Sequence, residues 1–146
     1  MRLQPARTVV VDADCLVAGT LTSEGATSRL VDLWEVGAIE LAVCPRLLHE
    51  VSKTLLNPRV AGKYSIDPAD VTAFVDRLRG EGIASADPVE PDRVVPGDPN
   101  DDYLVALALE AEAEYLVTRD RHFEKVRVKG LSIITPGRLV RLLDRA

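Results

Sequence analysis

The stretch TVVVDADCLVAG, residues 8–19, indicates both the fold class and a first candidate site residue. Residues 8–11 are β-branched, and a continuous run of this kind predicts a strand that is buried on both faces. Such strands are typical of parallel sheets that carry helices on both sides. Asp12 follows the run directly, and open α/β sheets bind their ligands beyond the carboxyl ends of the strands. Asp12 is therefore a candidate ligand-binding residue.

The rest of the chain alternates between strand-like and helix-like segments. We expect strands at residues 8–11, 40–44, 114–117 and 131–134, and helices at residues 26–36, 45–56, 68–80, 101–112 and 136–143. The segment 83–97 holds four Pro or Gly residues and predicts a weak strand and a loop. This alternation predicts an α/β fold with a central, mostly parallel sheet covered on both faces. A chain of 146 residues fits one domain, residues 1–146, around one core.

The composition is that of an ordinary globular protein, with 47% hydrophobic and 28% charged residues. Cys15 and Cys44 are isolated, which argues against a disulfide framework or a zinc site, and we expect both to be buried. The chain has no apolar run near the ~20 residues that cross a bilayer, so no membrane association is expected. Its first residues lack the pattern of a signal peptide, and a cytoplasmic location is the expectation.

Charge is distributed unevenly along the chain, although the formal net charge is only −5. Residues 87–114 hold nine acids and one base, whereas residues 119–146 hold eight bases and three acids. An acidic centre beside a basic segment suits a cation site next to a surface that holds phosphate. Solvated charges on helix surfaces would give the same pattern, and the sequence leaves both interpretations open.

Three further acids can reach the sheet edge at which Asp12 is expected. Glu50 lies in the first turns of the helix at 45–56, Asp101 opens the helix at 101–112, and Asp120 follows the strand at 114–117. Two carboxylates ~4 Å apart repel by roughly 4 kcal/mol at an effective dielectric of about 20. A fold that gathers such groups must therefore protonate some of them or bind a cation, and Mg²⁺ and Mn²⁺ favour oxygen ligands.

This acid set predicts metal-dependent phosphodiester hydrolysis. A divalent ion makes water more acidic and offsets charge that develops on phosphoryl oxygens. Other hydrolytic designs find little support, because His49 and His122 are the only histidines. The sequence also contains no GxSxG and no GxxxxGK[ST] motif.

Three segments together resemble a known family, the PIN domain, and in particular the PIN-type (VapC-like) toxins of prokaryotic toxin–antitoxin systems. The segments are VVVDADCLVAG, CPRLLHEVSKTL and DPNDDYLVALALEAEAEYLVTRDRHF, at residues 9–19, 44–55 and 98–123. The resemblance runs from Thr8 to about Pro136. It implies a three-layer α/β/α sandwich and an endoribonuclease that uses Mg²⁺ or Mn²⁺ to cut RNA.

Carried over residue by residue, the resemblance implies four catalytic acids, namely Asp12, Glu50, Asp101 and Asp120. Of these, Asp12, Asp101 and Asp120 would bind the metal. Asp98, Asp102 and Asp101 compete for the third position, since each could instead cap the helix, and Leu104, Ala106 and Ala108 favour Asp101.

Other residues near these acids are candidates for supporting roles. The family usually has Thr or Ser and then Asn after the first acid, whereas this chain has Ala13 and Asp14. Asp14, Asp98 and Thr118 are candidates for supporting the metal ligands, Thr118 by orienting a carboxylate or a water through its hydroxyl. Arg119 and Arg121 are candidates for RNA contacts. For His122 and Phe123 we expect packing rather than catalysis.

Two other functions fit parts of the sequence. VVVDADCL and GDPNDD resemble the acidic motifs of haloacid-dehalogenase-like phosphatases, in which Asp12 would be the nucleophile and Asp14 a general acid. That interpretation leaves Glu50 and the VTRD motif unexplained. The other alternative is a non-catalytic PIN-fold binding module.

A toxin of this kind would have a protein partner. We expect a cognate antitoxin that covers the acids by inserting Arg or Lys, with the helices at 26–36 and 45–56 supplying an apolar groove. Homodimers are common among proteins of this family, so a homodimer is a further expectation.

Overall fold

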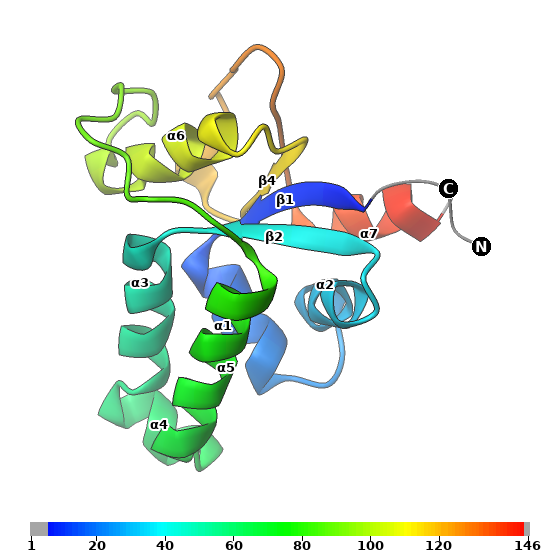
Figure 1. Cartoon of the computed structure of the whole chain (residues 1–146), viewed down its shortest axis with the longest axis vertical. Coiled ribbons are helices and arrows are strands. Elements are labelled where there is room, and N and C mark those ends of the chain that lie inside the picture. Colours follow the sequence, from blue (N-terminus) through cyan, green and yellow to red (C-terminus); the bar gives the residue numbers. More distant parts are fainter. Residues whose placement is uncertain (1–5, 145–146) are drawn as a thin grey trace.

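The computed structural model describes residues 6–144 and shows a five-stranded, fully parallel sheet as the middle layer of the fold (Figure 1). The strands lie in the order β3-β2-β1-β4-β5. Their bounds are β1 Arg7–Val11, β2 Ile39–Val43, β3 Ile83–Ala84, β4 Tyr115–Val117 and β5 Ser132–Ile134. Every pairing between neighbouring strands is parallel, which confirms the expected α/β class.

Helices cover both faces of this sheet, as expected for an α/β/α sandwich. Their bounds are α1 Ala13–Leu21, α2 Ala26–Glu35, α3 Pro45–Leu55, α4 Pro58–Tyr64, α5 Pro68–Glu81, α6 Asp102–Glu110 and α7 Pro136–Asp144. In Figure 1, α6 lies above β1 and β4, whereas α1, α2 and α5 lie on the opposite side of the sheet. None of the helices in residues 6–144 is long and apolar enough to cross a membrane.

The first strand is the centre of the sheet and of the core. Val9 and Val10 are fully buried, because β2 and β4 flank β1 and helices cover its two faces. Val10 is paired with Leu116 of β4, so the carboxyl ends of β1 and β4 lie next to each other. Both cysteines are free and buried, as expected.

Most expected elements are present, but three details differ. The Asn57-Pro58 pair ends α3 and also begins the short helix α4, in which the Asn57 side chain accepts a hydrogen bond from the Arg59 amide. The helix expected at 101–112 is shorter: a 3-10 turn, η1, occupies Pro99–Asp101, and α6 ends at Glu110. The third difference is α1, which begins directly after Asp12 and for which no bounds were predicted.

Gly19 allows α1 and α2 to pack closely. A Cβ atom at this position would lie 2.6 Å from the Thr27 carbonyl oxygen and 2.7 Å from a methyl group of Val31. The two helices therefore approach through a position that only glycine fills without displacing backbone.

Candidate active site

The candidate site lies at the carboxyl ends of β1 and β4. The Asp12 amide donates to the Val117 carbonyl at 3.0 Å, which extends the β1–β4 ladder by one residue. Asp12 therefore leaves the sheet beside the segment Thr118–Asp120 that follows β4. The sequence predicts that Asp12 and Asp120 each follow a strand. Because β1 and β4 are parallel neighbours, the ends of these two strands lie side by side.

Both oxygens of the Asp12 carboxylate accept hydrogen bonds. Oδ1 accepts from the Cys15 amide at 2.8 Å and caps α1, and Oδ2 accepts from the hydroxyl of Thr118. Asp12 is only 8% exposed, so these two bonds fix the orientation of a nearly buried carboxylate. Each oxygen keeps a further lone pair, because a carboxylate can accept about four hydrogen bonds or ligand contacts in all.

Thr118 links Asp12 to Asp120. Its hydroxyl donates to Asp12 and accepts from the Asp120 amide at 3.0 Å. The Asp120 carboxylate then accepts from the His122 amide at 2.9 Å and caps the 3-10 turn η2, Arg121–Phe123. One buried hydroxyl thus aligns the segments that carry two of the candidate acids.

Asp98 and Asp101 reach the same place from the η1 turn. Oδ2 of Asp98 lies 3.8 Å from Nδ1 of His122. Burial, followed by the neighbouring Asp98 and Asp120, raises the pKa of Asp101 from its usual value of 3.8 to about 7. Burial and the neighbouring carboxylates both disfavour the ionised form of Asp101, and a bound cation would offset that penalty.

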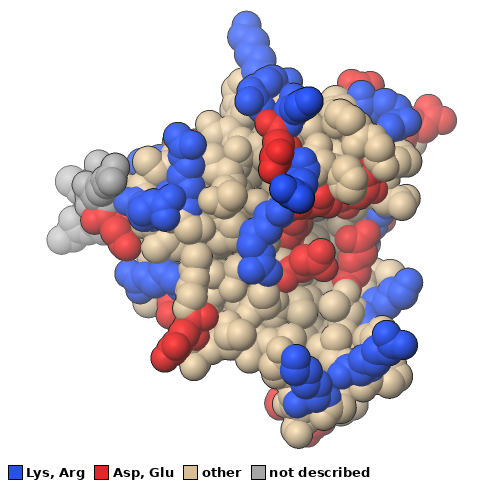
Figure 2. All heavy atoms as spheres, turned by 180° about the vertical axis from the view of Figure 1, so that it is seen from behind, with Lys and Arg blue, Asp and Glu red and all other residues tan. Residues whose placement is uncertain are grey.

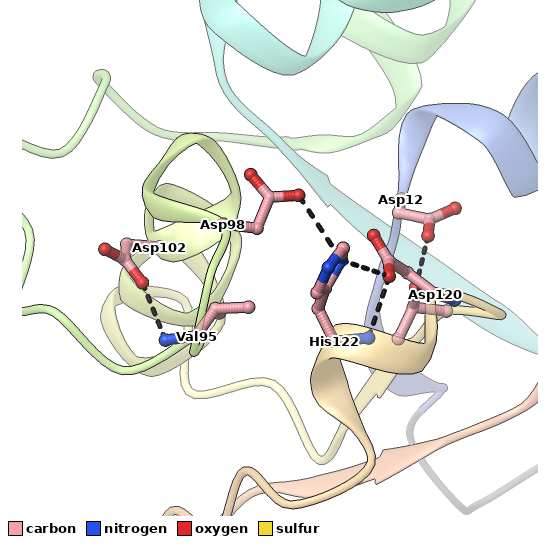
Figure 3. A network of polar contacts seen from close by, with 7 residues as sticks. Asp12, Val95, Asp98, Asp102, Asp120 and His122 are labelled. Carbon is pink, nitrogen blue, oxygen red and sulfur yellow. Dashed lines mark hydrogen bonds and ion pairs between the residues drawn. The ribbon is translucent and has the colours of Figure 1, made fainter.

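Three of these residues lie within metal-ligand distance of one another. Ligand atoms of Asp98, Asp120 and His122 all fall within 4.8 Å of each other (Figure 3). Nδ1 of His122 lies 2.9 Å from Oδ1 of Asp120. Two carboxylates and an imidazole are a donor set that suits Mn²⁺ and similar ions. The metal set predicted from the sequence, Asp12, Asp101 and Asp120, shares only Asp120 with this group.

The expectation that both His122 and Phe123 pack in the core is wrong for His122. Phe123 is buried, but the side chain of His122 is half-exposed and faces Asp98 and Asp120. The sequence gives no direct sign that the side chains of His122 and Phe123 point in different directions. The signal that could have identified it is its place two residues after Asp120, inside a one-turn helix.

Asp102 has a structural role that excludes it from the metal position. Its side chain is 1% exposed and accepts from the Arg93 guanidinium at 2.7 Å and from the amides of Val94 and Val95 at 3.0 and 2.8 Å. Although burial alone opposes ionisation, these donors together hold the pKa of Asp102 below its usual value. Figure 3 shows Asp102 on the far side of the turn from Asp120.

Glu50 does not belong to the group formed by Asp98, Asp120 and His122. Its Oε2 accepts from the Tyr103 hydroxyl at 2.8 Å, and its Oε1 lies 3.6 Å from the Arg46 guanidinium. Arg46 stacks over the Tyr103 ring at 4.2 Å and donates to the Asn100 carbonyl at 2.9 Å. Glu50 is therefore held between α3 and α6, and Arg46 ties α3 to the η1 turn that carries Asp101.

The remaining candidates lie around this centre. Asp14 is exposed beside the site; partial desolvation and then the neighbouring Asp12 raise its pKa, while Arg119 opposes the rise. Arg119 lines a pocket that begins at Thr118. Arg121 extends into solvent, with a side chain that is 92% exposed, and its one ion pair within residues 6–144 is with Glu124, at 4.0 Å.

The surface reflects the charge pattern of the sequence. Figure 2 shows acidic side chains gathered in an indentation, with Lys and Arg side chains in a band beside it. The fold thus places cations next to these carboxylates on this face. This arrangement suits a site that binds an ion and a polyanion together.

The comparisons with known proteins agree with this architecture. The family model of the PIN domain matches residues 8–122. A crystal structure of PAE2754 from Pyrobaculum aerophilum has a similar fold, with a TM-score of 0.59 and 22% identity over 99% of this chain and 95% of that chain. No curated protein sequence matches this chain.

The parallel sheet, its two helical layers and the acids at its carboxyl edge define a protein with a nuclease-type fold. The chain belongs to the PIN-domain family, since the family model matches most of its length. Proteins of this family are generally nucleases that use a divalent metal, and the acid cluster offers a site for one. Membership of this family favours a nuclease over the phosphatase interpretation of Asp12.

Proposed function

We propose that this protein is an endoribonuclease that hydrolyses RNA phosphodiesters with the help of Mg²⁺ or Mn²⁺. The observation that carries the proposal is the meeting of Asp98, Asp120 and His122 at metal-ligand spacing beside Asp12. Asp101 lies in the same cluster, as the effect of Asp98 and Asp120 on its pKa shows. The choice of RNA rests on the resemblance of residues 9–19, 44–55 and 98–123 together to PIN-type toxins.

The donor set fits a hard or borderline divalent ion. Asp98, Asp120 and His122 would hold it, with Asp12 and Asp101 as further oxygen donors. When bound, the ion would acidify a water and offset the charge that develops on the phosphoryl oxygens.

The chain's own residues orient this centre. Thr118 and the Cys15 amide hold the Asp12 carboxylate in one orientation, and Thr118 fixes the Asp120 segment through its amide. The Tyr103 hydroxyl and Arg46 hold Glu50 at the border of α3 and α6. In the proposed reaction Glu50 positions the substrate or its water from that border.

The test compares the purified chain with its Asp12→Asn variant on end-labelled single-stranded RNA. We expect cleavage with Mn²⁺ or Mg²⁺, none with EDTA, and a loss of at least about a hundredfold in the variant. Asp76→Asn, an exposed acid on α5, is the matched control and should cleave normally. The same assay on single-stranded DNA defines the sugar preference.

Two results would overturn the proposal. The first is equal cleavage by Asp12→Asn with folding intact by circular dichroism, and the second is cleavage that is indifferent to EDTA. The absence of RNA cleavage by the parent chain with either ion would instead support the non-catalytic binding module.

We further propose that the enzyme is the toxin of a toxin–antitoxin pair. The resemblance supports this, and the acid cluster supplies a place where an antitoxin Arg or Lys would take the position of the metal. We had expected an antitoxin groove between the helices at 26–36 and 45–56. The groove nearest to them has a mixed polar and apolar lining from α1, α3, α4 and α5, with Leu55, Phe74 and Asp70 among its residues, and no residue of α2 lines it.

Expression tests both parts of this second proposal. The chain produced alone should arrest growth, and Asp12→Asn should not. Co-expression with the adjacent small reading frame should yield a stable complex. Growth that is unaffected by the active chain would argue against a toxin. The homodimer that the resemblance predicts is tested by sedimentation of the purified chain.

A further inference from the structure

A second site adjoins the acid cluster on the other side of β4. It is a pocket of about 660 Å³ formed by η2, the segment after it, β5 and the start of α7. Thr118 and Asp120 belong both to this pocket and to the acid cluster, so the two are continuous. Its volume lies in the range of about 300–1,000 Å³ typical of ligand sites.

Four bases line the pocket, namely Arg119, Arg127, Lys129 and Arg138, against the acids Asp120 and Glu124. Within residues 6–144, none of these four bases takes part in an ion pair. Most other arginines of the described chain do pair with acids, as Arg7, Arg29 and Arg79 illustrate. Bases that line one pocket without ion-pair partners favour the binding of anions there.

One of these bases is fixed in position by the backbone. Nη1 of Arg127 donates to the carbonyls of Glu124 and Val126 at 2.9 and 3.0 Å. Because one amino group is engaged in this way, the rest of the guanidinium is oriented and remains available. A planar guanidinium matches the geometry of phosphate and binds it with two parallel hydrogen bonds.

The lining favours contacts to the sugar–phosphate backbone of a nucleic acid over contacts to its nucleobases. The pocket walls between the charges are aliphatic, with Val128, Leu131 and Ile133 among them. Its only aromatic residue, Phe123, is 3% exposed and offers no stacking face. Contacts to phosphate position a nucleic acid but do not read its sequence.

We infer that this pocket holds the phosphates of the single-stranded RNA that flanks the cleaved bond, on the side of β5 and α7. This inference rests on the proposed RNA cleavage. The RNA would run from the acid cluster into the pocket along the segment Thr118–Asp120, which belongs to both. Arg127, Lys129 and Arg138 bind the phosphates without base preference, and Arg119 bridges the two sites.

The experiment measures binding without cleavage, in the Asp12→Asn background, by anisotropy of an end-labelled single-stranded RNA over a range of salt. Each phosphate contact contributes about 0.7 to the slope of log K against log salt. The pocket variant Arg127→Gln, Lys129→Gln, Arg138→Gln should therefore lower the slope by about 2 and weaken binding about a hundredfold at ~0.1 M salt.

The matched control removes three charges elsewhere, with Arg7→Gln, Arg29→Gln and Arg79→Gln, each of which forms an exposed ion pair. It should keep the slope of the parent. If the loss of the Arg127 backbone contacts disturbs folding, Lys129→Gln with Arg138→Gln keeps them and should lower the slope by about 1.4.

Equal slopes and affinities for the pocket and control variants would overturn the inference. So would a pocket variant that binds RNA normally but loses a co-expressed protein partner, since that result assigns the pocket to the protein. These outcomes differ from failure of the proposed function, which would show as an absence of RNA cleavage by the parent chain, whatever the slopes.

Discussion

Asp101 and Asp102 are adjacent acids, and replacing each by Asn should change stability in opposite directions. The pKa of Asp101 is raised to about 7 in the folded protein, against 3.8 for an unperturbed carboxyl. The pKa of Asp102 is instead lowered by its three donors. Asn keeps the size of the side chain and removes its charge, so the pair isolates the electrostatic effect.

The sign for Asp101 follows from proton binding. Between about pH 4 and pH 7, the folded protein holds a proton that the unfolded chain has lost, so its free energy of unfolding falls as pH rises. At about 1.4 kcal/mol for each pKa unit, the ceiling is about 4 kcal/mol. Asp101 is partly exposed and shares its interactions with Asp98 and Asp120, so we expect about half of this ceiling.

Without metal, Asp101→Asn should therefore be more stable than the parent by about 2 kcal/mol at pH 8, with little difference at pH 4. Asp102→Asn should be less stable by about 1–3 kcal/mol at pH 8, because its buried donors lose a charged acceptor. Its stabilisation is present above the unfolded pKa and is lost as pH falls through the folded value.

Urea denaturation in EDTA, followed by circular dichroism at several pH values, measures both effects. A destabilised Asp101→Asn at pH 8 would refute the reasoning, since it would show that the ionised carboxylate is a favourable partner of its neighbours. Mn²⁺ should stabilise the parent more than Asp101→Asn, because an ion that binds the folded state offsets the repulsion.

The remaining predictions concern single contacts of the site and the fold. His122→Gln should lower Mn²⁺ affinity more than Mg²⁺ affinity by calorimetry, because imidazole favours Mn²⁺ over Mg²⁺; an unchanged Mn²⁺ affinity would remove His122 from the metal group. Thr118→Val should cost about 1–3 kcal/mol in urea denaturation and lower cleavage, since Asp12 loses a donor; unchanged cleavage would show that Thr118 does not orient the site. Gly19→Ala should destabilise by about 1–3 kcal/mol through its contact with the Thr27 carbonyl, and an unchanged unfolding midpoint would contradict the close packing of α1 on α2.

The sequence predicts the frame of this protein well because its signals are local. A β-branched run followed by an acid is sufficient to place β1 and Asp12. The helix α4 was not predicted, because the Asn57-Pro58 pair that follows the helix at 45–56 is a signal both for the end of one helix and for the start of the next. Local chemistry permits both outcomes, and packing decides between them.

The composition of the acid cluster could not be predicted in the same way. Asp98, Asp101 and Asp102 are neighbours in sequence, and the direction of each depends on the η1 turn. Asp102 turns inward, where it accepts from the amides of Val94 and Val95 and from the Arg93 side chain. The spacing of residues in the sequence does not predict these contacts. His122 joins the group only through the fold of η2.

The pairing of β1 with β4 also has a consequence for how the protein is made. The partners Val10 and Leu116 are far apart in sequence, as are Asp12 and Thr118. Contacts of such high sequence separation form late, because a long loop must close first. A nascent chain emerging from the ribosome carries Asp12 early, but its carboxylate has no hydroxyl partner until residue 118 has emerged. The acid cluster is therefore assembled only after residues 118–122 have emerged, so a shorter nascent chain lacks the proposed cleavage centre.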